Sequence, residues 1–267
     1  MNGVSVILPC YNEAQNIGAC LESLTWADEI MVVDSFSTDN TLDIAREFTS
    51  TILQHEYVNP AAQRNWAIPQ AKYDWVLIMD ADERVTSELR EEILATVASP
   101  DAYAGYFIRR RNYFAGKEIR HCGWQKDWVV RLFKRDEGRY ESDRDYNYHA
   151  GVKVRTGKVG RLKHVMDHYP YRNLTTYLEK LRRYADWGGL DSNQQGKRAT
   201  FRRLLFHPMG RFLRMYLLQK GFLDGMHGLI ICTMAACYVA LQDARLWEIQ
   251  FIENKSIDSK SVESIES

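Results

Sequence analysis

In Trp75-Val76-Leu77-Ile78-Met79-Asp80-Ala81-Asp82-Glu83 an uninterrupted apolar run leads directly into acidic residues, which is typical of a buried strand that ends at a polar edge. Similar apolar runs occur at 4–8, 30–33 and 51–54, and helical patterns separate them. Near-continuous apolar strands that alternate with helices are typical of a parallel sheet covered on both faces. The first hundred residues are therefore predicted to form an α/β fold with a mostly parallel central sheet and flanking helices.

Beyond Pro100 the pattern changes to shorter strands, expected at 103–108, 128–133, 152–154 and 159–164, between irregular charged segments. From Asn173 onward the spacing of apolar residues becomes helical. Four parts are predicted. They are an α/β half at 1–100 that binds the nucleotide-sugar, an α+β half at 101–172 on the acceptor side of the same catalytic domain, a helical C-terminal extension at 173–250, and a flexible tail at 251–267.

Composition narrows the class of protein. The 267 residues are 45% hydrophobic, and 35 basic residues balance 35 acidic ones, which argues against a disordered chain and against a basic protein wrapped by nucleic acid. The five cysteines lack the spacing of a zinc or redox motif. No secretory signal precedes the first strand, and the longest apolar run, 229–241, is shorter than the roughly 18 residues of a spanning helix. These observations predict a cytoplasmic protein.

The polar residues that follow the predicted strands indicate the functional site, because the carboxyl ends of parallel strands meet at one sheet edge. Asn12 and Glu13 follow the first strand, Asp34 ends the second, and Asp80 and Asp82 follow the fourth. Two carboxylates spaced by two residues in extended chain point to the same side and can hold one hard cation. The alternatives are a solvated turn at the D-x-D pair and helix capping by the other three residues.

Four motifs together resemble the signature of family 2 glycosyltransferases. In order they are Val6-Ile7-Leu8-Pro9-Cys10-Tyr11-Asn12-Glu13, Val32-Val33-Asp34-Ser35, Gln63-Arg64-Asn65 and Leu77-Ile78-Met79-Asp80-Ala81-Asp82-Glu83. The later half is similar to bacterial inner-core lipopolysaccharide β-glucosyltransferases through His121-Cys122-Gly123-Trp124, Arg131-Leu132-Phe133, Tyr177-Leu178-Glu179-Lys180, 211–216 and 221–225. The resemblance covers roughly residues 3 to 248.

The resemblance implies a GT-A fold and an inverting hexosyltransferase that uses a UDP-sugar, with glucose from UDP-glucose as the expected donor, and Mg or Mn. Pro9 and Asn12 lie in the motif that implies nucleotide binding, and Glu13 and Asp34 would hold the ribose and base. Three further residues complete the implied site: Arg64 approaches the diphosphate, Asp80 the ribose and metal, and Asp82 the metal. A divalent cation would stabilise the charge that develops on the departing diphosphate.

The acceptor hydroxyl must lose a proton, and inverting members of the family use a carboxylate base. Asp127 is preferred because it directly precedes a strand and follows the Gly-Trp element shared with the subgroup; the alternative is an ion pair with a nearby Arg. Asp143, Asp145 and His149 are the other candidates, and Ala150 stands where the subgroup often has Glu.

A second departure from the family pattern lies in the predicted nucleotide loop. Phe36 stands where the family usually has Gly in an Asp-Ser-Gly-Ser turn. Because a positive φ is unfavourable for a side chain of this size, the backbone is not expected to take a positive φ there.

Residues 197–220 contain seven basic residues, no acidic residue, and interleaved Phe and Leu. Such a helix can lie in a membrane interface, which would suit a peripheral enzyme on the inner face of the cytoplasmic membrane acting on a lipid-linked glycan acceptor. The alternative is a solvated helix face packed on the catalytic domain. Rival functions are transfer to polyprenyl phosphate or a capsule intermediate, and a catalytically silent scaffold that binds a sugar nucleotide or lipid.

Overall fold

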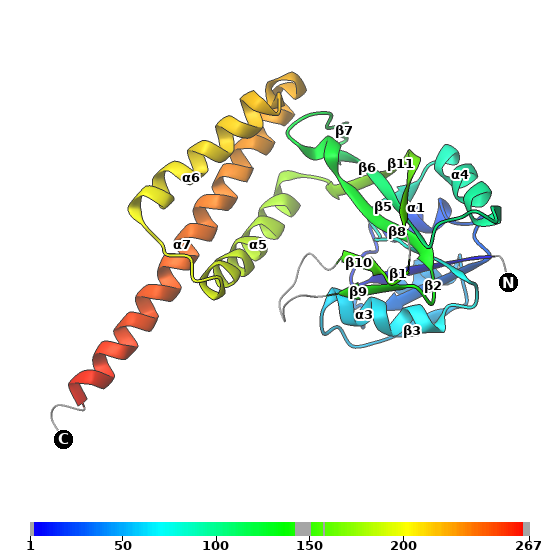
Figure 1. The fold of residues 1–267 in the computed structure, drawn as a ribbon, viewed down its shortest axis with the longest axis horizontal. Helices are drawn as coiled ribbons and strands as arrows, with labels where there is room; N and C mark the ends of the chain where they lie inside the picture. Colours follow the sequence, from blue (N-terminus) through cyan, green and yellow to red (C-terminus); the bar gives the residue numbers. More distant parts are fainter. Residues whose placement is uncertain (1–2, 142–150, 157, 264–267) are drawn as a thin grey trace. The chain divides into compact units, whose positions relative to one another are not determined.

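The computed structural model describes residues 3–141, 151–156 and 158–263, with 253–263 described by their backbone alone. The chain forms two compact units (Figure 1). The first contains Met1–Asn112 and Lys126–Pro170, and the second contains Tyr113–Gln125 and Tyr171–Ser267. The first unit carries the motifs of the predicted site, whereas the second is mainly helical.

The central sheet of the first unit has the strand order β3-β2-β1-β4-β8-β6-β11-β5. Its parallel part consists of β1 (Val4–Cys10), β2 (Glu29–Asp34), β3 (Ile52–Gln54) and β4 (Trp75–Ile78). The strands β8 (Trp128–Lys134), β6 (Gly105–Phe114), β11 (Val159–Tyr171) and β5 (Glu83–Val85) continue it, with antiparallel pairing of β8 to β4 and β6 and of β5 to β11. A mixed α/β fold with a large central sheet is therefore confirmed.

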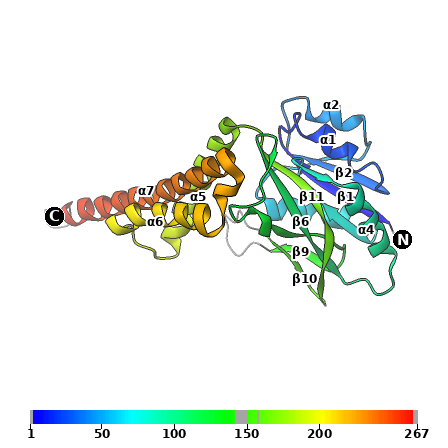
Figure 2. The ribbon, with the colours of Figure 1, turned by 90° about the horizontal axis from the view of Figure 1, so that it is seen from above.

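Helices cover both faces of this sheet, as the apolar strands predict. Alternate residues of β1 and β4 belong to two separate buried clusters, so each strand is buried on both sides. One face is covered by α1 (Ile17–Glu22), α2 (Thr41–Arg46) and α4 (Ser87–Ala98). The other is covered by α3 (Pro60–Ala67), which η1 (Ile68–Gln70) continues, and by the hairpin of β9 (Gly138–Glu141) and β10 (Gly151–Val154). Figure 2 shows two of these helices, α1 and α2, on the side of β1 and β2 away from the β9–β10 hairpin.

The spacing of apolar residues after Thr86 predicts a helix that Thr86 caps and that buries Leu89, Ile93, Leu94 and Val97. The start of this helix is confirmed, because the Thr86 hydroxyl accepts the Leu89 N–H at 3.2 Å. Leu89, Ile93 and Val97 are buried, but Leu94, which was also expected inside, is 41% exposed. Leu89, Ile93 and Val97 are spaced by four and therefore share one face of α4. Leu94 lies at the margin of that face, because the next residue along a helix is turned by about 100°.

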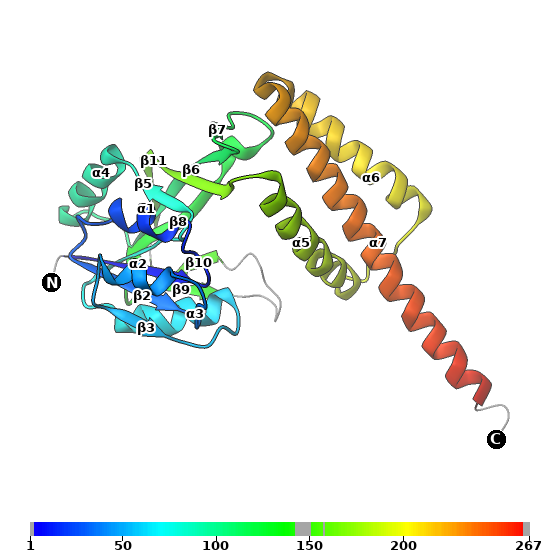
Figure 3. The ribbon, with the colours of Figure 1, turned by 180° about the vertical axis from the view of Figure 1, so that it is seen from behind.

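The second unit is built on three helices, α5 (Leu174–Gln194), α6 (Phe201–Leu213) and α7 (Gly225–Glu263), seen in Figure 3. A π-helical turn η3 (Arg214–Leu218) and a short η4 (Gly221–Asp224) connect the last two. The N-terminal segment of this unit contains β7 (Lys117–Glu118) and the first two residues of η2 (Trp124–Lys126). Residues 251–263, expected in a flexible tail, belong to α7. Of the residues described, 221–252 are apolar and long enough to cross a membrane, and only 28% of their most apolar stretch is buried.

Candidate active site

The site lies at the carboxyl ends of three neighbouring parallel strands, β2, β1 and β4. Cys10 at the end of β1 is in register with Asp34 at the end of β2, and Ile7 is in register with Ile78 of β4. The loops that follow these strands therefore leave the sheet at the same edge, as predicted. Pro9 is half-buried within β1, opposite Val33.

The loops after β1 and β2 are joined by hydrogen bonds between them, and their side chains do not cap a helix. Asn12 has a positive φ of 53°, and its side-chain oxygen accepts the Thr38 N–H at 2.8 Å. The Glu13 N–H donates to the Thr41 hydroxyl at 2.8 Å, and the Glu13 carboxylate accepts Asn16 Nδ2 at 2.6 Å. Neither side chain caps α1, whose N-cap is Asn16.

Asp34 is fully buried at the end of β2. Its carboxylate accepts the Ser37 N–H and hydroxyl and Gln54 Nε2. It caps no helix, because α2 begins after Asn40. The same turn holds Phe36, which is 54% exposed and has a φ of 60°, so the expectation of a negative φ there is wrong. The hydrogen bonds that Asp34 accepts from Ser37 impose the turn despite the cost of a left-handed residue.

Arg64 reaches the site because its neighbours anchor α3 on both sides. The Gln63 side chain donates to the Ser35 hydroxyl at 2.6 Å, and Asn65 exchanges hydrogen bonds with the backbone of Tyr140 at 2.7 and 2.9 Å. Arg64 Nη2 then donates to Asp80 Oδ1 at 2.6 Å. Its buried Nε–H has no hydrogen-bond partner within the described residues, so an acceptor from a ligand would satisfy it.

Asp80 carries an arginine on each carboxylate oxygen, because Arg131 Nη2 pairs with its Oδ2. Burial by itself raises the pKa of Asp80, but the attraction of Arg131 and Arg64 outweighs it and lowers the pKa well below its ordinary value. Asp80 is thus held ionised as the centre of an arginine clamp. Because both oxygens of Asp80 pair with arginines, its carboxylate is poorly placed to bind a metal as well.

A chain of alternating charges continues from Asp80 toward β6. Arg131 on β8 also donates to the fully buried Glu83 at 2.6 Å, and Arg110 on β6 lies 3.4 Å from the same carboxylate. The second oxygen of Glu83 accepts the Asp80 N–H at 3.0 Å. Glu83 therefore shapes the turn of the D-x-D pair and is an acidic partner that Arg131 and Arg110 share.

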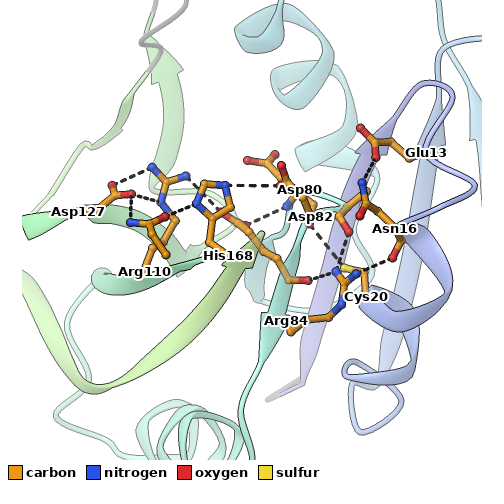
Figure 4. Close-up of polar contacts among 12 residues, drawn as sticks. Glu13, Asn16, Cys20, Asp80, Asp82, Arg84, Arg110, Asp127 and His168 are labelled. Carbon is orange, nitrogen blue, oxygen red and sulfur yellow. Dashed lines mark hydrogen bonds and ion pairs between the residues drawn. The ribbon is translucent and has the colours of Figure 1, made fainter. Parts of the chain in front are cut away.

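Asp82 faces a histidine that follows from the pairing of β5 with β11 (Figure 4). His168 is in register with Glu83, and its Nε2 lies 3.6 Å from Asp82 Oδ1. His168 Nδ1 lies 2.6 Å from Asn112 Oδ1, while Asn112 Nδ2 donates to Asp127 Oδ2 at 3.1 Å.

The hydrogen-bond partners determine the histidine tautomer. Because a carboxylate only accepts, the amide nitrogen of Asn112 must face Asp127, so its oxygen faces His168. His168 Nδ1 therefore donates, which leaves the Nε2 lone pair directed at Asp82. Burial lowers the pKa of His168, which keeps the ring neutral.

Two acceptors thus face each other across 3.6 Å, a separation that one divalent cation can bridge, since each metal bond is about 2.0–2.2 Å. Among the described residues no group of three His, Cys, Asp or Glu is placed to hold a metal. One or two carboxylates completed by diphosphate oxygens and water are nevertheless a usual arrangement for Mg, and the imidazole nitrogen would be a softer additional ligand. Asp82 and His168 fit a divalent cation better than Asp80 and Asp82 do.

Asp127, the preferred base, is held at the start of β8 by three hydrogen bonds. Arg110 binds both of its oxygens, at 2.7 and 2.9 Å, and Asn112 donates the third (Figure 4). Burial raises the pKa of Asp127, but the bonds and charge of Arg110 lower it overall. The alternative of an ion pair is therefore realised, and it also fixes the orientation of the carboxylate. Asp143, Asp145, His149 and Ala150 lie outside the described residues.

A family model for glycosyl transferase family 2 matches residues 5–168. The chain is a family 2 glycosyltransferase. It is 29% identical over 251 residues to the lipopolysaccharide core biosynthesis glycosyltransferase LpsC of Rhizobium meliloti, which covers 92% of each chain. It is 25% identical over 267 residues to the uncharacterized glycosyltransferase RP128 of Rickettsia prowazekii, covering 97% of this chain and 91% of that one.

The same family 2 glycosyltransferase chain is similar in structure to the mannosyltransferase PcManGT of Pyrobaculum calidifontis, solved in complex with GDP-Man and Mn²⁺. The TM-score is 0.51 at 18% identity, over 91% of this chain and 86% of that one. The similarity supports the GT-A fold.

Sequence reasoning did not assign several residues that the fold of this glycosyltransferase brings to the site. They are Glu83, Arg110, Asn112, Arg131 and His168. The available signal was a charged or polar residue inside an otherwise apolar strand pattern, as with Arg131 in 128–134. That signal does not identify which residues these side chains pair with, because the partners lie on strands that are distant in sequence.

Proposed function

We propose that the chain is an inverting, metal-dependent hexosyltransferase that moves glucose from UDP-glucose onto a lipopolysaccharide inner-core precursor or another lipid-linked glycan. The observation that carries this proposal is the facing pair of Asp82 and His168 beside the clamp of Arg64 and Asp80. The similarity to LpsC, a lipopolysaccharide core biosynthesis glycosyltransferase, supports the acceptor class.

The donor would occupy the edge formed by β2, β1 and β4. Glu13 and Asp34, with Pro9 and Asn12 in the same loops, are proposed to contact the base and ribose, for which carboxylates and amides are suitable partners. Asp34 is buried and already accepts hydrogen bonds from Ser37, Gln54 and the Cys10 thiol, so the ligand would have to displace one of these donors to reach its carboxylate. Arg64 would turn its unpartnered Nε–H toward the diphosphate.

Asp82 and His168 would hold Mg or Mn, and PcManGT was solved with Mn²⁺ and a nucleotide-sugar. When bound, such a cation stabilises negative charge on the leaving diphosphate as a Lewis acid. The protein's own part is to keep His168 neutral through burial and through the Asn112 hydrogen bond. Arg64 and Arg131 add fixed positive charge at the same edge.

Asp127 is proposed to take the proton from the acceptor hydroxyl. A low pKa makes it a weak base, but the carboxylate is ionised at neutral pH and the arginine and asparagine hold it in one orientation. Arg110 and Asn112 are therefore positioning residues.

The test is release of UDP from UDP-glucose by the full-length protein, with and without a purified heptose-containing core acceptor. We expect acceptor-dependent release and a new glucosylated product by mass spectrometry. Asp82→Ala should abolish release through loss of metal, whereas Asp127→Asn should reduce turnover while leaving UDP binding unchanged. Glu91→Gln, an exposed carboxylate on α4, is the matched control.

The rival functions have distinct outcomes in the same assay. Turnover with polyprenyl phosphate but not with the core acceptor would change the assigned acceptor. Binding of UDP with Mn, without turnover on any acceptor tested, would establish a silent sugar-nucleotide scaffold instead of an enzyme.

A further inference from the structure

Helix α6 turns its apolar side chains to the outside. Its four residues Phe201, Leu205, Met209 and Leu213, spaced by four, share one side of the helix, and all four are exposed, Phe201 to 79%. The exposed side chains of Leu204 and Phe206 widen this stripe. No residue of α6 is buried, which is unusual for a helix with such a marked apolar side.

The polar side of α6 faces inward because α7 carries a buried acid. Asp243 is 1% exposed, and its two oxygens pair with Arg203 Nε at 2.6 Å and His207 Nδ1 at 2.9 Å. Arg203 and His207 are four residues apart and share the opposite side of α6. Rotating the helix to bury its apolar stripe would leave Asp243 buried without partners, a strongly unfavourable state. The outward orientation is therefore specified by the chain.

The surroundings of the stripe are positively charged. Residues 197–220 contain seven basic residues and no acidic one. Arg203 is committed to Asp243, and the other six are exposed. Within the described part of the chain, no acidic side chain forms an ion pair with those six. Their charges remain available to phosphate groups outside the protein.

We propose that this docking surface, defined as the exposed apolar stripe of α6 with the basic residues of 197–220, inserts into the interface of a membrane containing anionic lipid. Apolar side chains on one side with basic residues at its margin match the boundary between acyl chains and anionic headgroups. The inference deepens the proposed function, on which it rests for the lipid-linked acceptor, by naming the surface that meets the lipid.

Two other occupants fit less well. A second copy of the chain would bring two basic segments together without an acid in either, and like charges repel. A spanning α7 would carry Asp243, Arg245 and Glu248 into or beside the hydrocarbon, which is costly for ionised groups.

The test is flotation of the full-length protein with phosphatidylcholine vesicles, with and without phosphatidylglycerol. We expect binding only with the anionic lipid, and weaker binding at high salt. The triple variant Phe201→Ser/Leu205→Ser/Met209→Ser should lower the vesicle affinity at least about tenfold. The double variant Arg202→Ser/Arg211→Ser should lower it about fivefold for each residue, equivalent to about 1 kcal/mol each. Leu94→Ser, an equally exposed leucine on α4, should bind as wild type.

Three results would overturn the proposal: equal binding to both vesicle types, wild-type vesicle binding by the triple variant, or self-association that the triple variant abolishes without any vesicle binding. Bound protein that resists extraction by alkaline carbonate would also overturn it, in favour of a spanning helix. Asp82→Ala should lose turnover and keep vesicle binding. A failure of the proposed enzymatic function would therefore leave this measurement intact.

Discussion

The Nε2 atom of His168 lies 3.6 Å from an oxygen of Asp82, and in the neutral tautomer that the Asn112 hydrogen bonds favour, neither atom has a hydrogen to donate to the other. The pair comes from the antiparallel register of β11 with β5, in which His168 stands opposite Glu83. Two facing acceptors repel each other unless a cation or a ligand donor lies between them. This is the strongest structural reason to connect the site with a divalent metal.

His168→Ala is expected to raise the Mn concentration needed for half-maximal turnover at least about tenfold, because it removes one of the two proposed protein ligands of the metal. The measurement is a Mn titration of UDP release, together with a Mn-dependent shift of the melting temperature in the presence of UDP. His164→Ala is the matched control on the same strand, since His164 pairs with Glu92 and not with Asp82. An unchanged Mn titration in His168→Ala would remove His168 from the metal site.

Arg131→Met is expected to destabilise the first unit by about 3–5 kcal/mol, because it leaves the fully buried Glu83 without its closest cation. Urea denaturation measures the free energy of unfolding. Arg46→Ala, which removes an exposed ion pair with Asp43, should cost at most about 1 kcal/mol. Similar values for the two variants would show that the buried charge chain contributes little.

The pH profile of turnover distinguishes Asp127 from His149 as the base. The pKa of Asp127 is lower than the ordinary pKa of an aspartate, which is about 3.9. Its side chain is therefore ionised at every pH above about 3.9 and becomes protonated only at lower pH. At saturating Mn, the acid limb of kcat should therefore show no inflection near pH 6.5. A limb near that value which disappears in His149→Ala would identify the histidine as the base.

Phe36→Gly is expected to leave stability unchanged or to raise it by at most about 1 kcal/mol, because glycine adopts the observed φ of 60° without strain. Ala95→Gly, at an exposed helical position of α4, should instead cost about 1 kcal/mol. Both are measured by urea denaturation. An equal loss in the two variants would argue against a left-handed residue in the turn after β2.

The parallel part of the sheet was predictable because each strand is marked by a local run of apolar residues. Asp34, Asp80 and Asp82 were predictable for the same reason, since they stand where those runs end. The φ of Phe36 was not, because hydrogen bonds from Ser37 to Asp34 override the preference of the residue itself. The exposure of Leu94 was not predictable either, since the apolar character of a residue at the margin of a helix face does not show whether other side chains pack over it.

Sequence alone determined the α/β class, the edge at which the acidic residues gather and the amphipathic character of 201–213, because all three depend on neighbours along the chain. The partners that those residues meet follow from how distant strands and helices pack together. The strand order β4-β8-β6-β11-β5 brings Arg131, Asn112 and His168 to the D-x-D pair, and buried Asp243 turns the apolar side of α6 outward. Such pairings depend on desolvated charges that are distant in sequence, and local periodicity carries no information about them.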